Sequence, residues 1–210
     1  MEVSEQERNW YAVKVFFNKV FKMEDILLDM DLETYLAVAK VQLKGQEHMR
    51  AARLLASVDE NHRKDSRYIQ EGPVIYERKP LVNSLIFVKA REEDLARIEK
   101  RLKDEFLSGQ ALGFIYKTAD RKKYAVIPDK QMTSFRLVTQ NGAEGLAFFS
   151  EDLMQFAQGD RVRVIDGPFK GAEGYIKRIK KDRRLLVCVE GVIAVATSYI
   201  PDKMLQIITE

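Results

Sequence analysis

The C-terminal quarter of the chain has the pattern that leaves the fewest folds open. Charged and apolar residues alternate from Arg161 to Val164, and a period of two returns from Tyr175 to Ile179. Because successive side chains of a β-strand point to opposite faces, this alternation predicts strands that bury one face. Further short strands are predicted at 185–189, 192–196, 199–201 and 205–207.

Glycine and proline separate these strands. Within Asp166–Pro168, the glycine can take a positive φ and the proline fixes the next one, which predicts a tight turn. Gly171 and Gly174 fall where closely coiled strands leave no room for a side chain. Several short strands so close together in the chain predict an SH3-like β-barrel over residues 156–210.

Strand and helix patterns alternate upstream of this barrel. Apolar residues recur at helical spacing over 20–30 and 95–106, and a shorter helix is predicted from Asp129. Strands are predicted at 10–15, 34–43, 73–76, 84–90, 113–116 and 124–127. The order β-α-β-β-α-β plus a helix is the ferredoxin-like split pattern. The predicted fold class is therefore α+β, with a ferredoxin-like N-terminal domain and a C-terminal barrel.

Turn-forming residues interrupt these patterns after residue 138. Asn141-Gly142 and Glu144-Gly145 are dipeptides typical of turns and loops. Domain boundaries fall in such segments, where few contacts cross. We therefore predict an N-terminal domain at 1–138, a linker at 139–155 and the barrel at 156–210.

A long segment at 44–72 does not fit the ferredoxin-like pattern, because connections between neighbouring strands are usually far shorter. The apolar side of a helix predicted over 48–58 consists of Ala51, Leu54, Leu55 and Val58. A mixed-charge run follows. The segment is interpreted as a helical insertion resting on the edge of the domain, and a specificity element presented to a partner is the alternative.

The net charge of +3 belongs to the C-terminal quarter. Residues 156–210 contain 10 Lys and Arg against 7 Asp and Glu, so the first 155 residues balance to zero. An excess of this size is well short of the broad basic face of a tight duplex-DNA binder.

The basic residues concentrate in the run from Lys177 to Arg184, and two interpretations of it stay open. As a solvated hairpin tip, the run keeps a strand edge from pairing with other chains. As a functional patch, it contacts nucleic-acid phosphates or an acidic protein surface, although no aromatic residue is interleaved to stack bases. The candidate contacts are Lys177, Arg178, Lys180, Lys181, Arg183 and Arg184.

The start of the chain is polar and mostly acidic, unlike a signal peptide, and no apolar run is long enough to span a bilayer. The single cysteine, Cys188, excludes an internal disulfide and fits a reducing cytoplasm. We expect a cytoplasmic protein, a monomer, with no membrane partner.

Residues that could carry catalysis or hold a metal are few. The glycines of the barrel lack the Lys-Ser/Thr of a phosphate-binding loop and are predicted to serve turns. His48, His62 and Cys188 lack metal-ligand spacing. The barrel contains no histidine that could activate Cys188 as a nucleophile. We therefore expect a protein that is not an enzyme, without catalytic residues, metal or cofactor.

Residues 159–176, GDRVRVIDGPFKGAEGYI, resemble the KOW motif of NusG-family and some ribosomal proteins. The structural residues of this motif are Gly159, Gly167, Pro168, Phe169, Gly171 and Gly174. Segments WYAV at 10–13, PLVNSLIFV at 80–88 and IPDKQM at 127–132 resemble the NusG N-terminal (NGN) domain. The last two are closer to specialised antiterminators of the RfaH-like and UpxY types than to the housekeeping factor.

This resemblance implies a contact with the clamp region of RNA polymerase through an apolar depression of the N-terminal domain. Motif positions assign the contact to Leu81, Val82 and Leu85, with Trp10 and Tyr11 supporting it from the neighbouring strand. The common family pattern has an aromatic pair followed by Pro-Gly-Tyr. Here the segment supplies aliphatic side chains and no ring.

The function implied is that of a transcription elongation and antitermination factor, which binds elongating RNA polymerase and suppresses pausing or termination at specific operons of the polysaccharide type. The barrel is expected to contact nucleic acid or an accessory or ribosomal protein. The alternative is a KOW-type RNA-binding or ribosome-associated protein without a polymerase role, whose RNA affinity would fall steeply with salt. The near-neutral first 155 residues favour polymerase binding.

Overall fold

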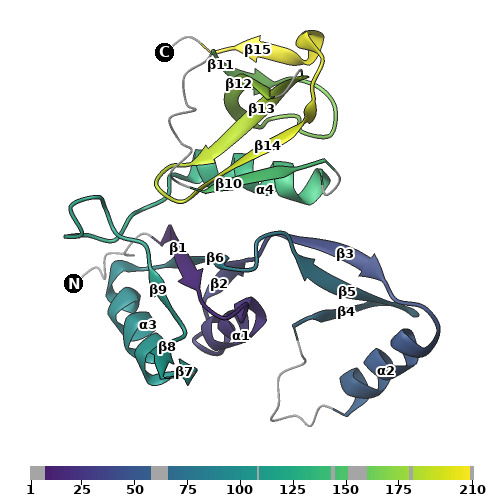
Figure 1. The fold of residues 1–210 in the computed structure, drawn as a ribbon, viewed down its shortest axis with the longest axis vertical. Helices are drawn as coiled ribbons and strands as arrows, with labels where there is room; N and C mark the ends of the chain where they lie inside the picture. The colour runs from purple at the N-terminus through teal and green to yellow at the C-terminus, as the bar shows by residue number, and fades with distance from the viewer. Residues whose placement is uncertain are drawn as a thin grey trace, which may run out of the picture. The chain divides into compact units, whose positions relative to one another are not determined.

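The structure is a computed structural model that describes residues 8–57, 66–107, 109–142, 145–150, 160–179 and 182–208 (Figure 1). Its internal contacts divide the chain into two compact units. The first unit comprises Val13–Val88 and Ala96–Phe114, and the second comprises Met1–Ala12, Lys89–Leu95 and Ile115–Glu210.

A four-stranded sheet in the N-terminal half has the strand order β2-β6-β1-β9. Its strands are β1 (Asn9–Val15), β2 (Glu33–Tyr35), β6 (Leu85–Ala90) and β9 (Gly113–Ile115). Helix α1 (Val20–Asp29) connects β1 to β2, and helix α3 (Glu92–Asp104) lies between β6 and the short strands β7 (Phe106–Leu107) and β8 (Gln110–Ala111) that precede β9. Of the apolar residues predicted to share one face of each helix, those within α1 and α3 are buried, among them Leu27 and Leu102.

The strand predicted at 34–43 is two strands in the structure. β2 ends at Tyr35, and β3 begins at Val38 and ends at Gln42. Leu36 and Ala37 between them are buried. The chain leaves the four-stranded sheet here, because β3 pairs with β5 (Val74–Pro80) in a separate sheet of order β3-β5-β4. Alternation continues through the break, so the sequence pattern did not reveal it.

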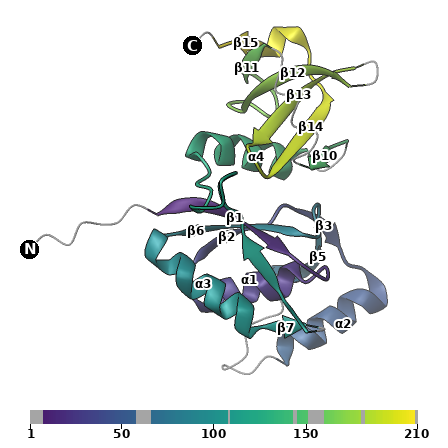
Figure 2. The same cartoon turned by 60° about the vertical axis from the view of Figure 1, so that its left-hand side comes forward.

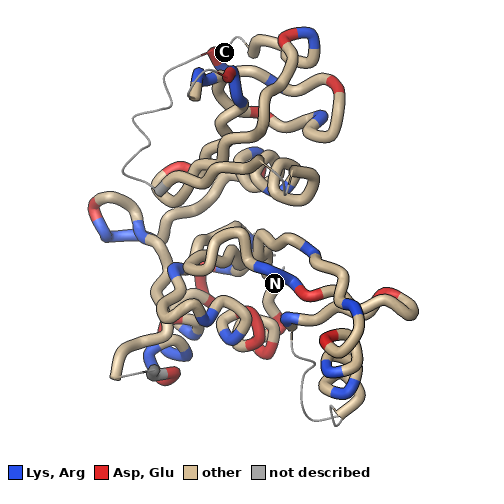
Figure 3. Tube along the Cα trace, turned by 45° about the vertical axis from the view of Figure 1, so that its right-hand side comes forward, with Lys and Arg blue, Asp and Glu red and all other residues tan. Residues whose placement is uncertain are grey.

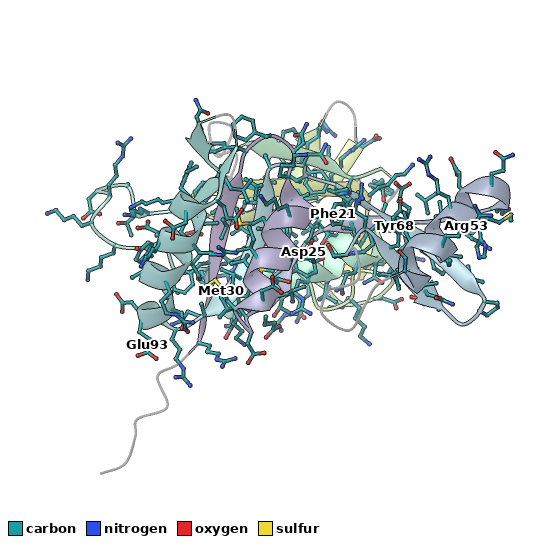
Figure 4. All side chains as sticks on the ribbon, turned by 90° about the horizontal axis from the view of Figure 1, so that it is seen from below. Phe21, Asp25, Met30, Arg53, Tyr68 and Glu93 are labelled. Atoms are coloured by element: carbon teal, nitrogen blue, oxygen red, sulfur yellow. The ribbon has the colours of Figure 1, made fainter. Side chains whose placement is uncertain are left out.

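The segment predicted as a helical insertion at 44–72 contains helix α2 (Gly45–Ala56) and strand β4 (Tyr68–Glu71), which pairs with β5. Leu43, Ala51 and Ile75 form a small buried cluster with partly buried neighbours including Leu55. Arg53 of α2 and Tyr68 of β4 are labelled in Figure 4. Val58 and His62 lie outside the described residues.

A buried ion pair fastens this three-stranded sheet to α1. Arg78 of β5 donates from Nη1 to Glu24 Oε2 over 2.6 Å and from Nη2 to Glu24 Oε1 over 2.8 Å. Its Nη1 also donates to the Ser66 carbonyl oxygen, and its guanidinium lies 5.5 Å from the centre of the Phe21 ring. Arg78 thus binds the Glu24 carboxylate through two hydrogen bonds, a bidentate geometry that the planar guanidinium group favours.

A six-stranded antiparallel sheet, here called the C-terminal sheet, has the order β10-β14-β13-β12-β11-β15 (Figure 2). Its strands are β10 (Ala147–Ser150), β11 (Arg161–Val164), β12 (Glu173–Ile179), β13 (Asp182–Val189), β14 (Ile193–Tyr199) and β15 (Leu205–Ile207). One face buries alternate apolar residues such as Val162, Val187 and Val195. The period of two in the sequence predicted this burial.

Two elements outside the predicted barrel join the C-terminal sheet. Helix α4 (Asp129–Asn141) packs against β12, β13 and β14, and β10 pairs with β14 from Ala147 to Ser150. Ala147 and Phe149 cover a cluster formed by Leu186, Ala194 and Ala196. The prediction of a linker over 139–155 is therefore wrong for residues 147–150, because the outer face of the sheet offers apolar surface that this strand buries.

Candidate functional site

The predicted polymerase-contact residue Trp10 is 3% exposed, and two cations lie near its ring. Lys89 Nζ is 5.8 Å from the centre of the indole ring, and the guanidinium of Arg136 on α4 is 5.7 Å from it. Trp10 also forms an isolated antiparallel bridge with Ile127. Each cation is attracted to the electron-rich face of the ring. Trp10 therefore holds neighbouring elements together and does not itself offer a surface.

Tyr11 is buried beside a cavity of about 590 Å³. Burial, followed by the negative charge of Glu92, raises the pKa of the Tyr11 hydroxyl. The cavity is lined by Asn9, Tyr11, Glu92, Glu93, Lys123, Tyr124 and Val126. Tyr11, like Trp10, is therefore a buried residue and presents little surface to a partner.

The predicted apolar contact divides into two parts. Leu81 and Val82 are half-buried in the connection between β5 and β6, where the Leu81 amide donates to the Ala37 carbonyl oxygen over 2.9 Å. Leu85 begins β6 and is only 6% exposed. The structure therefore brings Leu81 and Val82 to the surface together, and it places Leu85 in the core.

The predicted motif residues of the C-terminal sheet occupy tight positions. Gly167 and Gly171 have φ values of 83° and 94°, which favour glycine. A Cβ at Gly174 would lie 2.4 Å from the Leu186 carbonyl oxygen, so only glycine allows β12 and β13 to approach this closely. Phe169 is buried, and Pro168 is exposed in the turn. Gly159 lies outside the described residues.

Helix α4 contacts the C-terminal sheet through two polar groups. The Glu173 amide donates to Ser134 Oγ over 3.0 Å, and the Glu190 amide donates to Gln131 Oε1 over 3.1 Å. These residues border a cavity of about 220 Å³ that also meets Cys188. Burial, followed by the charge of Glu190, raises the pKa of the Cys188 thiol to about 11. This thiol stays protonated at neutral pH and is a poor nucleophile.

The predicted basic run lies on a β-hairpin whose strands bring its members into cross-strand pairs. Lys177 of β12 is opposite Arg184 of β13, and Arg178 is opposite Arg183. Figure 3 shows the Lys and Arg positions along the chain in blue. Lys180 and Lys181 lie outside the described residues. The structure therefore gathers four of the six predicted contacts on neighbouring strands.

An exposed aromatic side chain accompanies this hairpin, which the sequence did not predict. Tyr199 of β14 is paired with Arg184, although 15 positions separate them in the chain. The sequence showed no aromatic residue within the basic run, and the pairing of β13 with β14 supplies one from outside it. No local sequence signal could have revealed this neighbour, because the register of two strands decides it.

His48 Nε2 lies 3.2 Å from the Pro73 carbonyl oxygen. Within the described part of the chain, no group of three or more His, Cys, Asp and Glu side chains could hold a metal ion. The helices found there also lack the combination of length and apolar character that a membrane span requires.

Comparison with known proteins gives one family match. A model of the KOW motif matches residues 158–189, which include β11, β12 and β13. The motif suggests a C-terminal β-barrel and is consistent with a NusG-like or an RNA-binding protein. No curated protein matches the chain.

Proposed function

We propose that this KOW-containing protein is a NusG-type transcription elongation and antitermination factor, which binds elongating RNA polymerase and suppresses pausing or termination. The observation that carries the proposal is the KOW motif at 158–189, which follows an N-terminal half that contains its own sheets and helices. A KOW module alone fits many proteins. Its combination with an NGN-type domain is the arrangement of this family.

The strand order of the N-terminal sheet supports an NGN-type domain. β1, β2, β6 and β9 follow one another in the chain, with α1 after the first strand and α3 after the third, and they pair in the order β2-β6-β1-β9. This succession and order are those expected of a ferredoxin-like β-α-β-β-α-β unit. The three-stranded sheet and α2 extend that unit between its second and third strands.

The accessible part of the polymerase contact in this proposal is Leu81 with Val82. Both are apolar and half-buried, so a partner can remove their remaining surface from water. Leu85, Trp10 and Tyr11 are buried, so these three side chains offer little surface to a partner. Binding of this kind biases the conformational equilibrium of the polymerase toward elongation, and the chain itself makes and breaks no bonds.

The contact is tested with the double substitution Leu81→Asp and Val82→Asp in a pull-down with core RNA polymerase. Two buried carboxylates at an apolar interface should abolish association, because neither charge would find a partner. The control is Ile207→Asp, which places a carboxylate at an exposed aliphatic residue of β15. Circular dichroism checks that each variant is folded. Unchanged association of the folded double variant would remove Leu81 and Val82 from the site.

The function itself is tested by transcription with purified polymerase across a pause site and a terminator. The protein should increase read-through, and the Leu81→Asp, Val82→Asp variant should not. Read-through that is the same with and without the wild-type protein would overturn the proposed elongation role.

A second candidate function is RNA or ribosome binding without a polymerase role. The paired basic residues of the β12–β13 hairpin favour it, because Lys177 and Arg184 form a local concentration of positive charge. This candidate predicts RNA binding by the protein alone together with no effect on read-through. The two assays therefore separate the two functions.

A further inference from the structure

Three side chains form a row across three neighbouring strands of the C-terminal sheet. Lys177 of β12 is the register partner of Arg184 of β13, and Arg184 is the partner of Tyr199 of β14. Directly opposite residues of an antiparallel pair project to the same face, with their Cβ atoms about 5 Å apart. We call these three residues the Tyr199 row; the strands that carry it are labelled in Figure 2.

An irregularity in the pairing of β13 with β14 places the tyrosine in the row. Leu186 pairs with Ala196, and regular antiparallel register would then pair Arg184 with Ser198. The register shifts between Arg184 and Leu186, so that Arg184 pairs with Tyr199. Because side chains alternate between faces, one extra residue in β14 moves Tyr199 to the face of Arg184.

The buried hydroxyl of Thr197 maintains this irregularity. The Leu185 amide donates to Thr197 Oγ1 over 3.3 Å, where a regular ladder would use a backbone carbonyl oxygen. Thr197 Oγ1 in turn donates to the Ser198 carbonyl oxygen over 2.7 Å. Thr197 is fully buried, so its hydroxyl replaces the backbone partner that the extra residue displaces. Such bulges commonly re-aim a side chain near a functional site.

The result is an exposed ring beside positive charge. Tyr199 is 57% exposed, so its ring is accessible to a partner. Arg184 Nη2 is 3.7 Å from the Asp182 carboxylate, a long ion pair, and within the described residues its buried Nε has no hydrogen-bond partner. On the other face, Arg183 is 2.8 Å from Asp202 and is more closely neutralised. The ion pair of Arg184, which lies beside Tyr199, is thus longer than the ion pair of Arg183.

We propose that the Tyr199 row binds single-stranded RNA, with the tyrosine ring stacking on a base and Lys177 and Arg184 contacting the adjoining phosphates. An exposed ring next to cations is the combination that single-strand binders use, because every base offers a flat face and every nucleotide carries a negative charge. Bases in a duplex are already stacked on one another and cannot reach the ring. RNA is chosen over DNA because it is the nucleic acid that both candidate functions encounter. In that respect the inference rests on the proposed function.

Fluorescence anisotropy of the full-length protein with a labelled RNA of about 12 nucleotides, within the site sizes usual for such surfaces, tests the inference. Tyr199→Ala should weaken binding about tenfold and leave its salt dependence unchanged, because stacking involves no phosphate. Tyr199→Phe should bind like wild type. Arg184→Gln and Lys177→Gln should each lower the slope of log affinity against log salt by about 0.7.

Two matched variants control for nonspecific effects on the same sheet. Lys170→Gln removes one exposed positive charge from the loop between β11 and β12, and Ile207→Ala removes exposed apolar surface from β15. Both should bind RNA like wild type. Equal losses of RNA affinity in Lys170→Gln and Arg184→Gln would show that positive charge acts wherever it lies on the sheet. That result would overturn the proposal that the Tyr199 row is the RNA site. Equal RNA affinity of Tyr199→Ala and the wild-type protein would overturn the proposal that the Tyr199 ring stacks on a base.

The choice of ligand is tested with DNA of the same sequence and with an RNA duplex. The single-stranded RNA should bind more tightly than either, and DNA of equal or higher affinity would overturn the choice of RNA. The assay contains no polymerase. A failure here therefore leaves the read-through experiment untouched, and a failure of read-through leaves RNA binding to be measured by itself.

Discussion

At the scale of single residues, two carboxylates have structural tasks that their neighbours define. Glu24 faces Arg78 in a pocket where both side chains are almost fully removed from water. Glu173 accepts hydrogen bonds from Arg163 at 2.6 Å and 3.0 Å and from Arg161 at 3.3 Å. The first pair joins α1 to β5, and the second cluster joins β11 to β12. Removal of either carboxylate leaves arginine charge without its partner.

Glu24→Gln should destabilise the protein by about 3 kcal/mol, because it leaves the buried Arg78 guanidinium uncompensated. The expected result is a lower urea midpoint at pH 7. Glu71→Gln is the matched control, since it breaks the exposed Lys40–Glu71 pair and should change stability little. Equal midpoints for the two variants would contradict a structural role of the buried pair.

Glu173 should make the protein sensitive to acid. The hydrogen bond from Arg163, together with the charges of Arg163 and Arg161, lowers the pKa of Glu173 from 4.5. The stability that this carboxylate contributes is therefore fully present above pH 4.5 and is lost as the pH falls through the lowered folded pKa. Urea unfolding of Glu173→Gln between about pH 7 and pH 3 should show a smaller loss on acidification than wild type. Glu47→Gln, which removes an exposed carboxylate on α2, should retain the wild-type loss.

At the scale of elements, α4 and β10 complete the C-terminal sheet. α4 buries Met132, Phe135 and Val138, and it packs on β12, β13 and β14. β10 then covers the outer cluster around Leu186. Burial of each large apolar side chain contributes roughly 1.5–3 kcal/mol. The KOW motif therefore lies within a larger folding unit than its own residues define.

A fragment of residues 127–210 should be more stable than the predicted barrel of residues 156–210. The longer fragment retains α4 and β10, whose loss exposes apolar surface worth at least about 2 kcal/mol. Urea unfolding of both fragments, followed by circular dichroism, measures the difference. A further variant, Phe149→Asp in the longer fragment, should remove the part of the gain that β10 contributes. Equal midpoints for the two fragments would show that neither element stabilises the sheet.

At the scale of the whole molecule, apolar and charged contacts are segregated along the chain. The net charge of +3 belongs to residues 156–210, whereas Leu81 and Val82 belong to the first 155 residues, which carry no net charge. Apolar association depends little on salt, while contacts to phosphate weaken as counterions compete. The two proposed partners should therefore respond differently to ionic strength.

Raising the salt concentration from about 50 to 200 mM should weaken RNA binding by the full-length protein severalfold, since two phosphate contacts give a slope of about −1.4. Association with polymerase, measured by pull-down over the same range, should change much less. The Leu81→Asp, Val82→Asp variant should retain RNA binding. A parallel loss of both activities with salt would indicate that a single charged surface serves both partners.

The sequence alone determined those features that depend on residues close together in the chain. The alternation at 161–164 and 175–179 specified buried faces, the apolar spacing at 95–106 specified α3, and Gly167 and Gly171 specified turns that require positive φ. Each follows from local geometry, because a strand repeats every two residues and a helix every 3.6. The KOW motif was readable for the same reason.

Only the tertiary structure decided which distant segments meet. Residues 147–150 follow turn signals, so the sequence predicted a linker there. In the structure they form a strand that pairs with the edge of β14 and packs on an apolar cluster. Trp10 and Leu85 read as contact residues but are buried by elements from other parts of the chain. Tyr199 lies opposite Arg184 because β14 contains one extra residue in its pairing with β13. The Thr197 hydroxyl accepts a hydrogen bond from the Leu185 amide at this irregularity. Local periodicity in the sequence cannot predict this pairing, this burial or this position of Tyr199, because strand pairing and register are set by contacts between residues far apart in the chain.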